Sequence, residues 1–318
     1  MNILITGGTG FVGANLVRYL IQKENKVTII TKKKSDSWRL SSVSQKIDQR
    51  FINLENFEKI KKTMNEIRPE VVIHCATYGV YPYQNKIGNI IRTNILGSVN
   101  IMRSLVKADY FKRFINIGSV FEYSPKPQLL NEESVSNLST PYSISKVAQS
   151  YFVKYFHKEF DFPSVNLRIF TAYGPYEEPG RIVTDTMLAI IRNHKLSIST
   201  PKSKRDFIYI KDVLTAIEKA MTAPDIEGEI LNIGTGKTYS VEQLVNLACK
   251  ETGVKINVSK VNKEKNLRDD KSYGPANIQK AKKMLGWKPE YSLTDGLHKT
   301  YSWYKQNIKL YNTVGKKI

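Results

Sequence analysis

Two side chains that can move a proton stand four residues apart in one segment, Tyr142 and Lys146. On a helix this spacing puts both on one face. Thr140 and Pro141 fit an N-cap and a first helical position, so we expect a helix to begin there. A nearby ammonium lowers the phenol pKa from near ~10, and the phenol can then exchange a proton with a carbinol oxygen. An exposed pair on an amphipathic helix fits equally well, so the spacing alone decides nothing.

Ser119 is a hydroxyl that could assist the phenol, because it lies just past an expected strand at Phe114–Ile117. Ligands of parallel sheets collect at the carboxyl ends of the strands. We therefore expect Ser119 to hydrogen-bond the same substrate oxygen as Tyr142. The alternative is a plain turn that ends the strand.

Three glycines near the N-terminus, Gly7, Gly10 and Gly13, have the spacing of a dinucleotide-binding turn. They lie between an apolar strand at Ile3–Ile5 and a helix at Phe11–Gln22, which is the context that such a turn requires. The backbone can then approach a pyrophosphate closely, and the helix N-terminus offers it unpaired N–H groups. The alternative is a glycine-rich turn without a ligand.

The residues after the second strand decide which dinucleotide binds, since an acid there suits NAD and basic residues suit the 2′-phosphate of NADP. This chain has Thr31, Lys32 and Lys33 there, with Arg39 close behind. Asp36 is the one nearby acid and lies deeper in the loop. The sequence therefore favours NADP(H), with NAD(H) as the alternative.

Strands and helices alternate in the first half of the chain, which predicts an α/β fold with a Rossmann-type, doubly wound parallel sheet. Further strands are expected at Lys26–Ile30, Val71–His74, Val165–Phe170, Phe207–Ile210 and Glu229–Gly234. Further helices are expected from near Asn56 and at Asn94–Val106, Pro141–Phe160, Lys211–Met221 and Val241–Thr252.

The later part of the chain predicts a smaller α/β substrate domain interleaved with the first. The pattern becomes irregular after Tyr173–Pro175, and core-like strands then return. We expect a cofactor-binding domain at residues 1–174, joined by about 207–237, and a substrate domain at residues 175–206 and 238–318. A short strand at Lys255–Val258 and a frayed tail at Asn312–Ile318 are also expected.

Composition indicates an ordinary globular protein, with 41% hydrophobic and 25% charged residues over 318 positions. No apolar run is long enough for a bilayer, no signal-peptide pattern opens the chain, and Cys75 and Cys249 cannot make a disulfide framework. We expect a cytoplasmic protein without a metal. The net charge of +20 fits a nucleic-acid binder or a lysine-rich surface. Because the lysines are scattered and no aromatic residues alternate with them, we expect no nucleic-acid partner.

A set of motifs occurs in a fixed order along nearly the whole chain: TGGTGFVG, VVIHCAT, TNILGSVN, INIGSV, PYSISK, RIFTAYGP, RDFIYIKDV, LNIGTG and MLGWKP. In this set the chain resembles the extended short-chain dehydrogenase/reductases that act on nucleotide sugars. Within that family it looks most like 4-ketoreductases of the CDP-abequose and CDP-paratose synthase type. The closer likeness lies in ATYG, GSVFEY and KRDFIYIKDVLTAI.

The resemblance implies roles for named residues. Ser119, Tyr142 and Lys146 match the catalytic triad, Asn94 supports it, and Lys146 also holds the nicotinamide ribose. The residues implied at the cofactor are Gly7, Gly10, Phe11, Val12, Gly13, Thr31, Lys32, Lys33, Asn53, Leu54, Ala76, Asn94, Tyr142 and Lys146. Those implied at a nucleotide-diphosphate sugar are Tyr78, Tyr81, Ser119, Thr171, Arg181, Arg205 and Arg268, with Tyr83 as a further candidate. The two arginines Arg205 and Arg268 match diphosphate-binding positions, which suits a guanidinium fork.

Departures from the family pattern narrow the expected reaction. Val120 and Phe121 stand where 4,6-dehydratases carry an Asp-Glu pair, and Glu122 follows one place too late. Phe121 also occupies the place of the Cys of 3,5-epimerising reductases, while His74 and Cys75 read as core residues. Many members have Asn at the place of Thr171.

What remains is hydride transfer at one sugar carbon, most simply C4. We expect NADPH-dependent reduction of a nucleotide-linked 4-keto-6-deoxy sugar. The alternative is a 4-epimerase with tightly bound NAD, and a third class is an NADP(H)-binding regulatory or RNA-associated protein. A broad apolar stripe along the helix from Ser143 also predicts a homodimer. The nucleotide base, the sugar and the C4 stereochemistry do not follow from the sequence.

Overall fold

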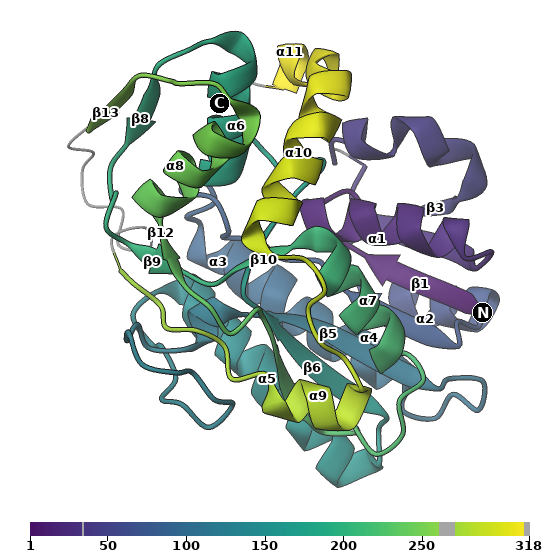
Figure 1. Cartoon of the computed structure of the whole chain (residues 1–318). Helices are drawn as coiled ribbons and strands as arrows, with labels where there is room; N and C mark the ends of the chain where they lie inside the picture. The colour runs from purple at the N-terminus through teal and green to yellow at the C-terminus, as the bar shows by residue number, and fades with distance from the viewer. Residues whose placement is uncertain (34, 261–270, 315–318) are drawn as a thin grey trace.

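Short apolar runs separated by helices form the strands of one parallel sheet. The computed structural model describes residues 1–33, 35–260 and 271–314. Within these residues, seven paired strands follow the order β11-β6-β5-β4-β1-β2-β3, all parallel (Figure 1). They are β1 (Asn2–Thr6), β2 (Lys26–Thr31), β3 (Asp48–Phe51), β4 (Val71–His74), β5 (Arg113–Ser119), β6 (Ser164–Ile169) and β11 (Ile230–Ile233). The winding direction reverses between β1 and β4, where doubly wound sheets bind ligands.

The helices alternate with these strands and continue to the C-terminus. The α-helices are α1 (Phe11–Gln22), α2 (Phe57–Ile67), α3 (Ile87–Ile90), α4 (Gly97–Leu105), α5 (Pro141–Phe160), α6 (Ile182–Arg192), α7 (Ile210–Ala220), α8 (Val241–Thr252), α9 (Gln279–Leu285), α10 (Leu293–Asn307) and α11 (Tyr311–Val314). The 3-10 and π segments are η1 (Trp38–Lys46), the π-helical η2 (Ile91–Leu96), η3 (Val120–Glu122) and η4 (Ile308–Leu310). No helix in the described ranges is both long and apolar enough to cross a membrane.

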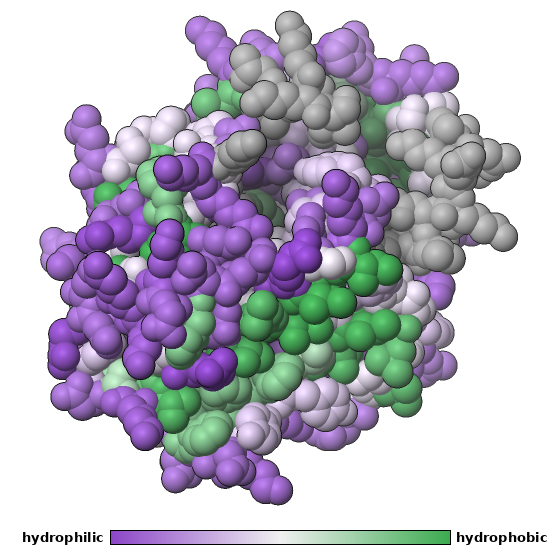
Figure 2. Space-filling view, turned by 180° about the vertical axis from the view of Figure 1, so that it is seen from behind, coloured by the Kyte–Doolittle hydropathy of each residue, from purple (hydrophilic) through white to green (hydrophobic). Residues whose placement is uncertain are grey.

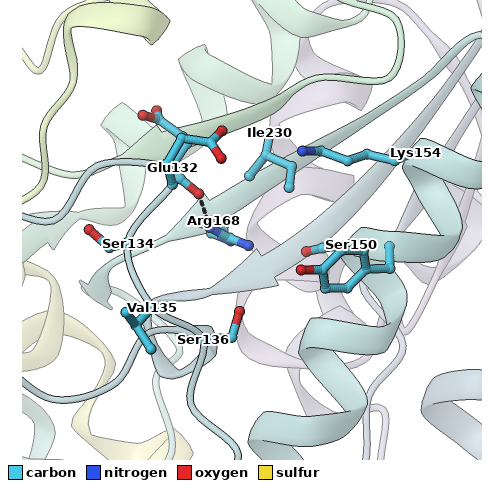
Figure 3. A pocket seen from close by; sticks show the side chains of 10 residues that line it. Glu132, Ser134, Val135, Ser136, Ser150, Lys154, Arg168 and Ile230 are labelled. Carbon is cyan, nitrogen blue, oxygen red and sulfur yellow. Dashed lines mark hydrogen bonds between the residues drawn. The ribbon is translucent and has the colours of Figure 1, made fainter.

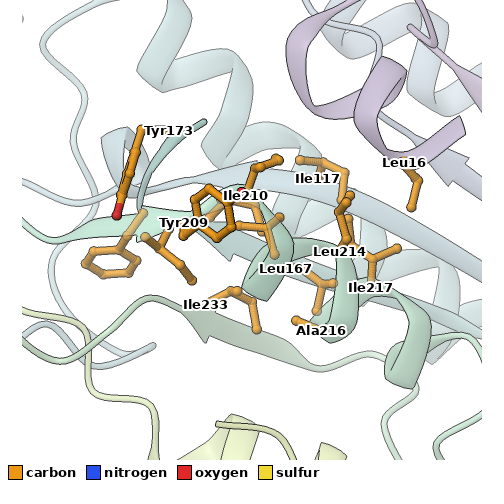
Figure 4. Packing of buried hydrophobic residues seen from close by; sticks show 14 of the residues in the cluster. Leu16, Ile117, Leu167, Tyr173, Tyr209, Ile210, Leu214, Ala216, Ile217 and Ile233 are labelled. Carbon is orange, nitrogen blue, oxygen red and sulfur yellow. The ribbon is translucent and has the colours of Figure 1, made fainter. Parts of the chain in front are cut away.

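Both faces of the sheet are buried, and the alternation of side chains divides the core into two layers. In β1, Ile3 and Ile5 belong to one layer and Leu4 to the other, as the two-residue period of a strand requires. Helices α1 and α7 cover the first layer, and α2, α4 and α5 cover the second. Figure 4 shows the first layer, with α7 packed on α1 and on three strands through Leu16, Ile117, Leu167, Ile210, Leu214, Ala216, Ile217 and Ile233. Burial on both faces explains why the strands read as continuous apolar runs.

A smaller group of helices, α6, α8 and α10, packs together beside the sheet (Figure 1). Three short strand pairs lie outside the main sheet: β7 (Thr171–Tyr173) with β10 (Phe207–Tyr209), β9 (Lys204–Arg205) with β12 (Tyr239–Ser240), and β8 (Leu196–Ile198) with β13 (Val258–Lys260). Because β7 follows β6 after a single residue, this group lies toward the carboxyl ends of the strands. The α/β fold expected from the sequence is confirmed.

Three local expectations were wrong. The segment after Tyr173–Pro175 contains helix α6, whose β-branched residues lower its helix propensity but whose apolar face packs on α8 and α10. The short strand expected at Lys255–Val258 lies at Val258–Lys260, where β8 pairs with it. Of the frayed tail expected at Asn312–Ile318, residues 312–314 belong to helix α11, whose buried Tyr311 donates its hydroxyl to the Glu177 carbonyl, and residues 315–318 lie outside the described residues. Pairing and packing, which no local pattern shows, account for each difference.

Candidate active site

The glycine turn after β1 is closely packed at two of its glycines and open at a third. Gly7 has φ +67°, and a Cβ there would lie 2.6 Å from the Ala76 nitrogen. A Cβ on Gly13 would lie 2.3 Å from the Gly7 carbonyl oxygen, so the turn and α1 need glycine at both positions. A Cβ on Gly10 would meet only that same oxygen, at 3.4 Å, so the space beside Gly10 is open. Gly8, which the glycine spacing does not single out, is also closely packed, since a Cβ there would lie 2.8 Å from the Ile29 side chain.

The start of helix α1 is suited to an anion. Gly10 is its N-cap and provides no side-chain cap, and the first turn contains no acidic residue. The half-buried Phe11 and Val12 follow, so their N–H groups stand at the positive end of the helix. Together with the open space beside Gly10, this geometry fits a dinucleotide pyrophosphate.

The segment after β2 carries two exposed cations and no nearby acid in the first positions. Thr31 is buried and donates its hydroxyl to the Lys32 carbonyl at 3.0 Å, while Lys32 and Lys33 are exposed. Arg39, the further cation noted in the sequence, is buried and points elsewhere. It donates to the Tyr176 carbonyl at 2.8 Å and to the Thr9 carbonyl at 3.3 Å, and it pairs with Glu178 at 2.7 Å. Arg39 therefore braces the glycine turn against the 176–178 loop.

Asn53 and Leu54, expected near the cofactor, lie just past the end of β3. Leu54 is buried in the second core layer, and Asn53 is exposed. The Asn53 side chain accepts from the Glu55 N–H at 3.3 Å, which fixes the turn that leads to α2. Both residues follow the strand that pairs with β2, so they lie on the same side of the site as the exposed lysines.

Ser119, Tyr142 and Lys146 all reach the carboxyl end of β5. Ser119 ends the strand, and Lys146 of α5 donates to the Ile117 carbonyl at 2.8 Å. Tyr142 packs edge-on against Phe121, with ring centroids 6.3 Å apart. The three side chains are 8%, 5% and 3% exposed, respectively. Because the Ser119 oxygen accepts from the Phe121 N–H at 3.2 Å, its own O–H is directed elsewhere and can donate to a ligand oxygen.

Helix α5 holds the phenol and the ammonium at fixed positions. Its N-terminus has a capping box in which the Thr140 side chain accepts from the Ser143 N–H and the Ser143 hydroxyl accepts from the Thr140 N–H. Burial lowers the pKa of Lys146 from 10.5 to about 8, and the nearby Glu122 carboxylate opposes this shift. Lys146 therefore loses its proton at a lower pH than a solvent-exposed lysine does.

Asn94 ties the loop after β4 to helix α5. It lies in the π-helical η2, a widened turn of a kind often found at functional sites. Its side chain accepts from the Tyr78 N–H at 2.7 Å and donates to the Tyr78 carbonyl at 2.9 Å. It also donates to the Ser145 hydroxyl at 2.8 Å, which in turn donates to the Tyr142 carbonyl at 2.7 Å. The sequence alone gives no sign of the widened turn.

His74 and Cys75 do not provide acid–base groups. His74 is fully buried, and burial lowers its pKa to about 3, so the ring is neutral. Ser98 donates to the Asn94 carbonyl and therefore accepts from His74 Nε2–H, which leaves Nδ1 to accept from Thr6. Burial raises the pKa of the Cys75 thiol to about 12. Both side chains contribute to the interior between β1, β4 and α4.

The loop after β4 meets the 176–181 loop through an aromatic and charged contact. The rings of Tyr81 and Tyr83 stack in parallel with centroids 5.4 Å apart, and the Arg181 guanidinium lies 4.9 Å from the Tyr81 ring centroid. The Tyr81 hydroxyl donates to Glu178 at 3.3 Å. Gln84, which the sequence analysis did not single out, accepts from the N–H groups of residues 79, 80 and 81. These contacts form one continuous surface beside the open end of the site.

The remaining candidates at the substrate lie farther along the chain. Thr171 begins β7 and is half-buried, and its N–H donates to the Asp206 carbonyl at 3.0 Å. Arg205 is buried, donates to the Ser203 hydroxyl and the Lys271 carbonyl, and lies 5.8 Å from the Tyr273 ring centroid. Arg268 lies outside the described residues.

The two residues directly after Ser119 are apolar, and the acid that follows them is buried away from the site. Val120 is buried, and Phe121 is half-buried between Tyr142 and Tyr273. Glu122 is 0% exposed and forms an ion pair with Arg168, N to O 2.7 Å. Its carboxylate is thus committed to the interior, and it cannot reach a bound sugar without breaking that pair. No local sequence pattern indicates Arg168 as its partner.

A separate cavity of about 210 Å³ lies on the outer side of β6 and α5 (Figure 3). Arg168 and Ser150 line it together with a loop and the edge strand, through Glu132, Glu133, Ser134, Val135, Ser136, Tyr151, Lys154 and Ile230. In Figure 3, Arg168 points into this space and donates to the Glu132 carbonyl at 3.0 Å. None of Ser119, Tyr142 and Lys146 lines this cavity.

Comparison with known sequences places these features in a family context. The profile of the NAD dependent epimerase/dehydratase family matches residues 3–234. A putative UDP-glucose 4-epimerase of Methanocaldococcus jannaschii is 28% identical over 319 residues, covering 96% of this chain and 99% of that protein. A dTDP-D-glucose 4,6-dehydratase of Dictyostelium discoideum is 27% identical over 356 residues, covering 96% of this chain and 82% of that protein.

Solved structures of 4-epimerases are also similar to this chain over nearly its whole length. A UDP-glucose 4-epimerase from Thermotoga maritima with UDP-glucose superposes with a TM-score of 0.88 at 26% identity, covering 97% of this chain and all (100%) of that one. A UDP-glucuronic acid 4-epimerase from Bacillus cereus, in complex with UDP-glucuronic acid and NAD, superposes with a TM-score of 0.85 at 25% identity, covering 96% and 100%. By their names, three of these four proteins are 4-epimerases and one is a 4,6-dehydratase.

Proposed function

The chain belongs to the NAD dependent epimerase/dehydratase family, and from this premise we propose that it is a nucleotide-sugar 4-epimerase that uses a nicotinamide cofactor. The observation that carries the proposal is the convergence of Ser119, Tyr142 and Lys146 at the end of β5 without an acid pair beside them. The 4-epimerases among the relatives support it. The substrate class is a nucleotide-diphosphate sugar.

The chain's own groups divide the work as follows. The N–H groups at the start of α1 would hold the pyrophosphate of the cofactor, which would supply reversible hydride transfer at C4. Tyr142 takes the proton of the C4 hydroxyl and gives it back, and Ser119 donates a hydrogen bond to that oxygen. The Lys146 ammonium stabilises the phenolate form of Tyr142. The sugar lies between this edge of the sheet and a substrate domain at residues 175–206 and 238–318.

Dehydration is a poorer match to these residues, although dehydratases are among the relatives. Elimination of water needs an acid and a base near C5 and C6, and the positions after Ser119 hold Val120 and Phe121. Glu122 is the nearest acid, and its carboxylate is buried against Arg168. Moving it to the sugar would leave the arginine as an unpaired buried charge.

A second candidate is NADPH-dependent reduction of a 4-keto-6-deoxy sugar, the function favoured by the sequence. It is supported by the exposed Lys32 and Lys33 after β2 and by Thr31, which stands where an acid would bind the ribose of NAD. Arg39 does not support this candidate, because its guanidinium pairs with Glu178 and is not available for a 2′-phosphate. Both candidates use the same three catalytic side chains and differ in the fate of the cofactor.

One assay separates the two candidates. The protein is incubated with UDP-, dTDP-, GDP- and CDP-sugars, in both 4-hydroxy and 4-keto-6-deoxy forms, with each cofactor in turn. An epimerase yields the C4 epimer with no net change in absorbance at about 340 nm, whereas a reductase consumes reduced cofactor in proportion to product. Proton NMR identifies the C4 configuration. Absence of any C4 change across the panel would contradict both proposals.

We also propose that the protein is a homodimer. Large apolar side chains are exposed on the neighbouring elements α3, η2 and α5: Ile87, Ile91, Leu96, Ile144, Tyr151 and Tyr155. Figure 2 shows a connected hydrophobic area on the face turned away in Figure 1. A patch of this kind marks an interaction surface. Light scattering should give twice the chain mass for the parent and a single chain mass for Ile91→Glu; a monomeric parent would contradict the proposal.

A further inference from the structure

Glu122 is a fully buried carboxylate three residues after the catalytic hydroxyl, and the reaction proposed above does not use it. A buried carboxylate is costly unless charges and hydrogen bonds compensate it. Its oxygens accept from the Ser119 N–H at 2.8 Å, from Arg168 Nε at 2.7 Å and from the Ser150 hydroxyl. So complete a set of donors indicates that the position of this carboxylate is tightly defined.

The bond to Ser119 acts directly on the site. Ser119 and Glu122 form a reciprocal capping box around the single turn η3. In it, the Ser119 oxygen accepts from Phe121 N–H while Glu122 accepts from the Ser119 N–H. The direction of the Ser119 hydroxyl is therefore coupled to the place of the Glu122 carboxylate.

The bond to Ser150 acts on the helix that carries the other two groups. Ser150 lies one turn after Lys146 on α5, so the two share a helix face. Its hydroxyl also accepts from the Asn166 side chain of β6 at 2.8 Å. Glu122 thus joins the end of β5, helix α5 and strand β6 at one point.

The sequence makes room for this carboxylate at Gly118. A Cβ on Gly118 would lie 2.5 Å from the Glu122 Oε1 and 2.8 Å from the Asn166 side-chain nitrogen. Arg168 is held on its other side by the Glu132 carbonyl and forms a wall of the cavity in Figure 3, whose lining does not include Glu122. The missing side chain at Gly118 leaves space for the carboxylate on one side, and Arg168 donates to it on the other.

We propose that Glu122 is a positioning residue for hydride transfer at C4, orienting Ser119 through its N–H and setting helix α5, with Tyr142 and Lys146, through Ser150. This inference rests on the proposed function. The same carboxylate is the main charge that opposes the lowering of the Lys146 pKa by burial. Glu122 therefore influences both the geometry and the charge of the site without touching the sugar.

The test compares Glu122→Gln with Glu133→Gln, which removes the same charge from an exposed position beside the cavity. We expect Glu122→Gln to lower kcat about 10- to 100-fold with KM for the sugar within about twofold, since the affected groups act in the transition state. The high-pH limb of its kcat profile should move down by about one pH unit, because Lys146 loses its proton more readily. Glu133→Gln should match the parent.

Ser150→Ala covers the case in which Glu122→Gln does not fold. It breaks the connection to α5 and keeps every charge, so we expect kcat to fall about 3- to 10-fold with no shift of the pH limb. A folded Glu122→Gln with the parent's kcat and pH profile would overturn the proposal, as would a Ser150→Ala with the parent's kcat. If the parent itself turns over no nucleotide sugar, the proposed function fails separately. Crystal structures of the parent and Glu122→Gln then decide the positioning role, which unchanged placement of Ser119, Tyr142 and Lys146 would exclude.

Discussion

At the residue scale, burial sets the chemistry of the site. Lys146 sits against a backbone carbonyl in a desolvated position, which weakens its hold on a proton. His74, one of the few other groups that could titrate near neutrality, is made inert by the same effect. Burial thus brings the pKa of Lys146, one helical turn after Tyr142, closer to neutrality.

Tyr142→Phe should lower kcat by about 10²- to 10⁴-fold, because it removes the group that exchanges the C4 proton. Cofactor affinity, measured by fluorescence titration, and the melting temperature should stay near those of the parent. The matched control is Tyr151→Phe, the same change on an exposed position of α5, which should keep full activity. A Tyr142→Phe protein with more than a tenth of the parent's kcat would contradict the role of the phenol.

The pH dependence of turnover should report on Lys146. Its pKa is lowered to about 8, so the ammonium is present below pH 8 and is lost as the pH rises through that value. We therefore expect kcat to fall above about pH 8, since the phenolate of Tyr142 then loses its stabilising cation. Lys146→Arg stays charged throughout and should lack this limb, although its absolute rate will be lower. A limb at the same pH in Lys146→Arg would assign it to another group.

At the element scale, the glycine turn contains two backbone contacts, at Gly7 and Gly13, that leave no space for a side chain. Gly13→Ala would place a methyl group 2.3 Å from the Gly7 carbonyl and force α1 away from the turn. We expect cofactor affinity to fall about 10- to 100-fold, since the helix N-terminus moves off the pyrophosphate. Gly253→Ala is the control: its left-handed φ of +69° also disfavours alanine, but nothing lies within 4 Å. It should cost about 1 kcal/mol of stability and leave cofactor affinity unchanged.

The main sheet and the place of the candidate site at its edge were largely predictable because they follow from local patterns. The apolar runs of β1, β4 and β5, the glycine turn and the capped start of α5 are all legible in the sequence. Strand β3 was not, since Asp48–Phe51 is a polar, half-exposed edge strand defined only by its pairing with β2. The π-helical turn around Asn94 was missed for a similar reason. No residue type marks it.

Long-range partners explain what the sequence could not give for the site. Arg39 reads as a cation for a 2′-phosphate, and its bond to Glu178, 139 residues away, changes that reading. Glu122 reads as a misplaced catalytic acid until Arg168 and Ser150 appear beside it. Such pairs depend on how β6, α5 and the 176–178 loop come together, and only the fold specifies this.

At the scale of the whole molecule, a buried acid connects the C-terminal helices to the rest of the chain. Glu177 accepts from Thr184 through its side chain, and its carbonyl accepts from Tyr304 and Tyr311. Burial raises the pKa of Glu177 to about 8, which Arg181 and Arg39 oppose and Asp185 reinforces. The folded state therefore holds a proton that the unfolded chain releases above its ordinary pKa of 4.5.

This linkage predicts that the stabilisation by Glu177 is complete below its unfolded pKa of 4.5 and is lost progressively as the pH rises from 4.5 to about 8. Glu177→Gln mimics the protonated acid, so its advantage over the parent in unfolding free energy should grow from about 1 kcal/mol at pH 5 to roughly 4 to 5 kcal/mol at pH 8.5. Urea unfolding at the two pH values measures both. Equal unfolding free energies of the two proteins at pH 8.5 would show that ionisation of Glu177 does not destabilise the fold.

The outer strand of the main sheet, β11, comes from residues 230–233, late in the chain. During synthesis on the ribosome, more than sixty further residues must be added after β6 before β11 can pair with its free edge. A bare strand edge pairs readily with other chains. Nascent chains stalled before residue 230 should therefore aggregate or recruit chaperones more than chains that already contain β11.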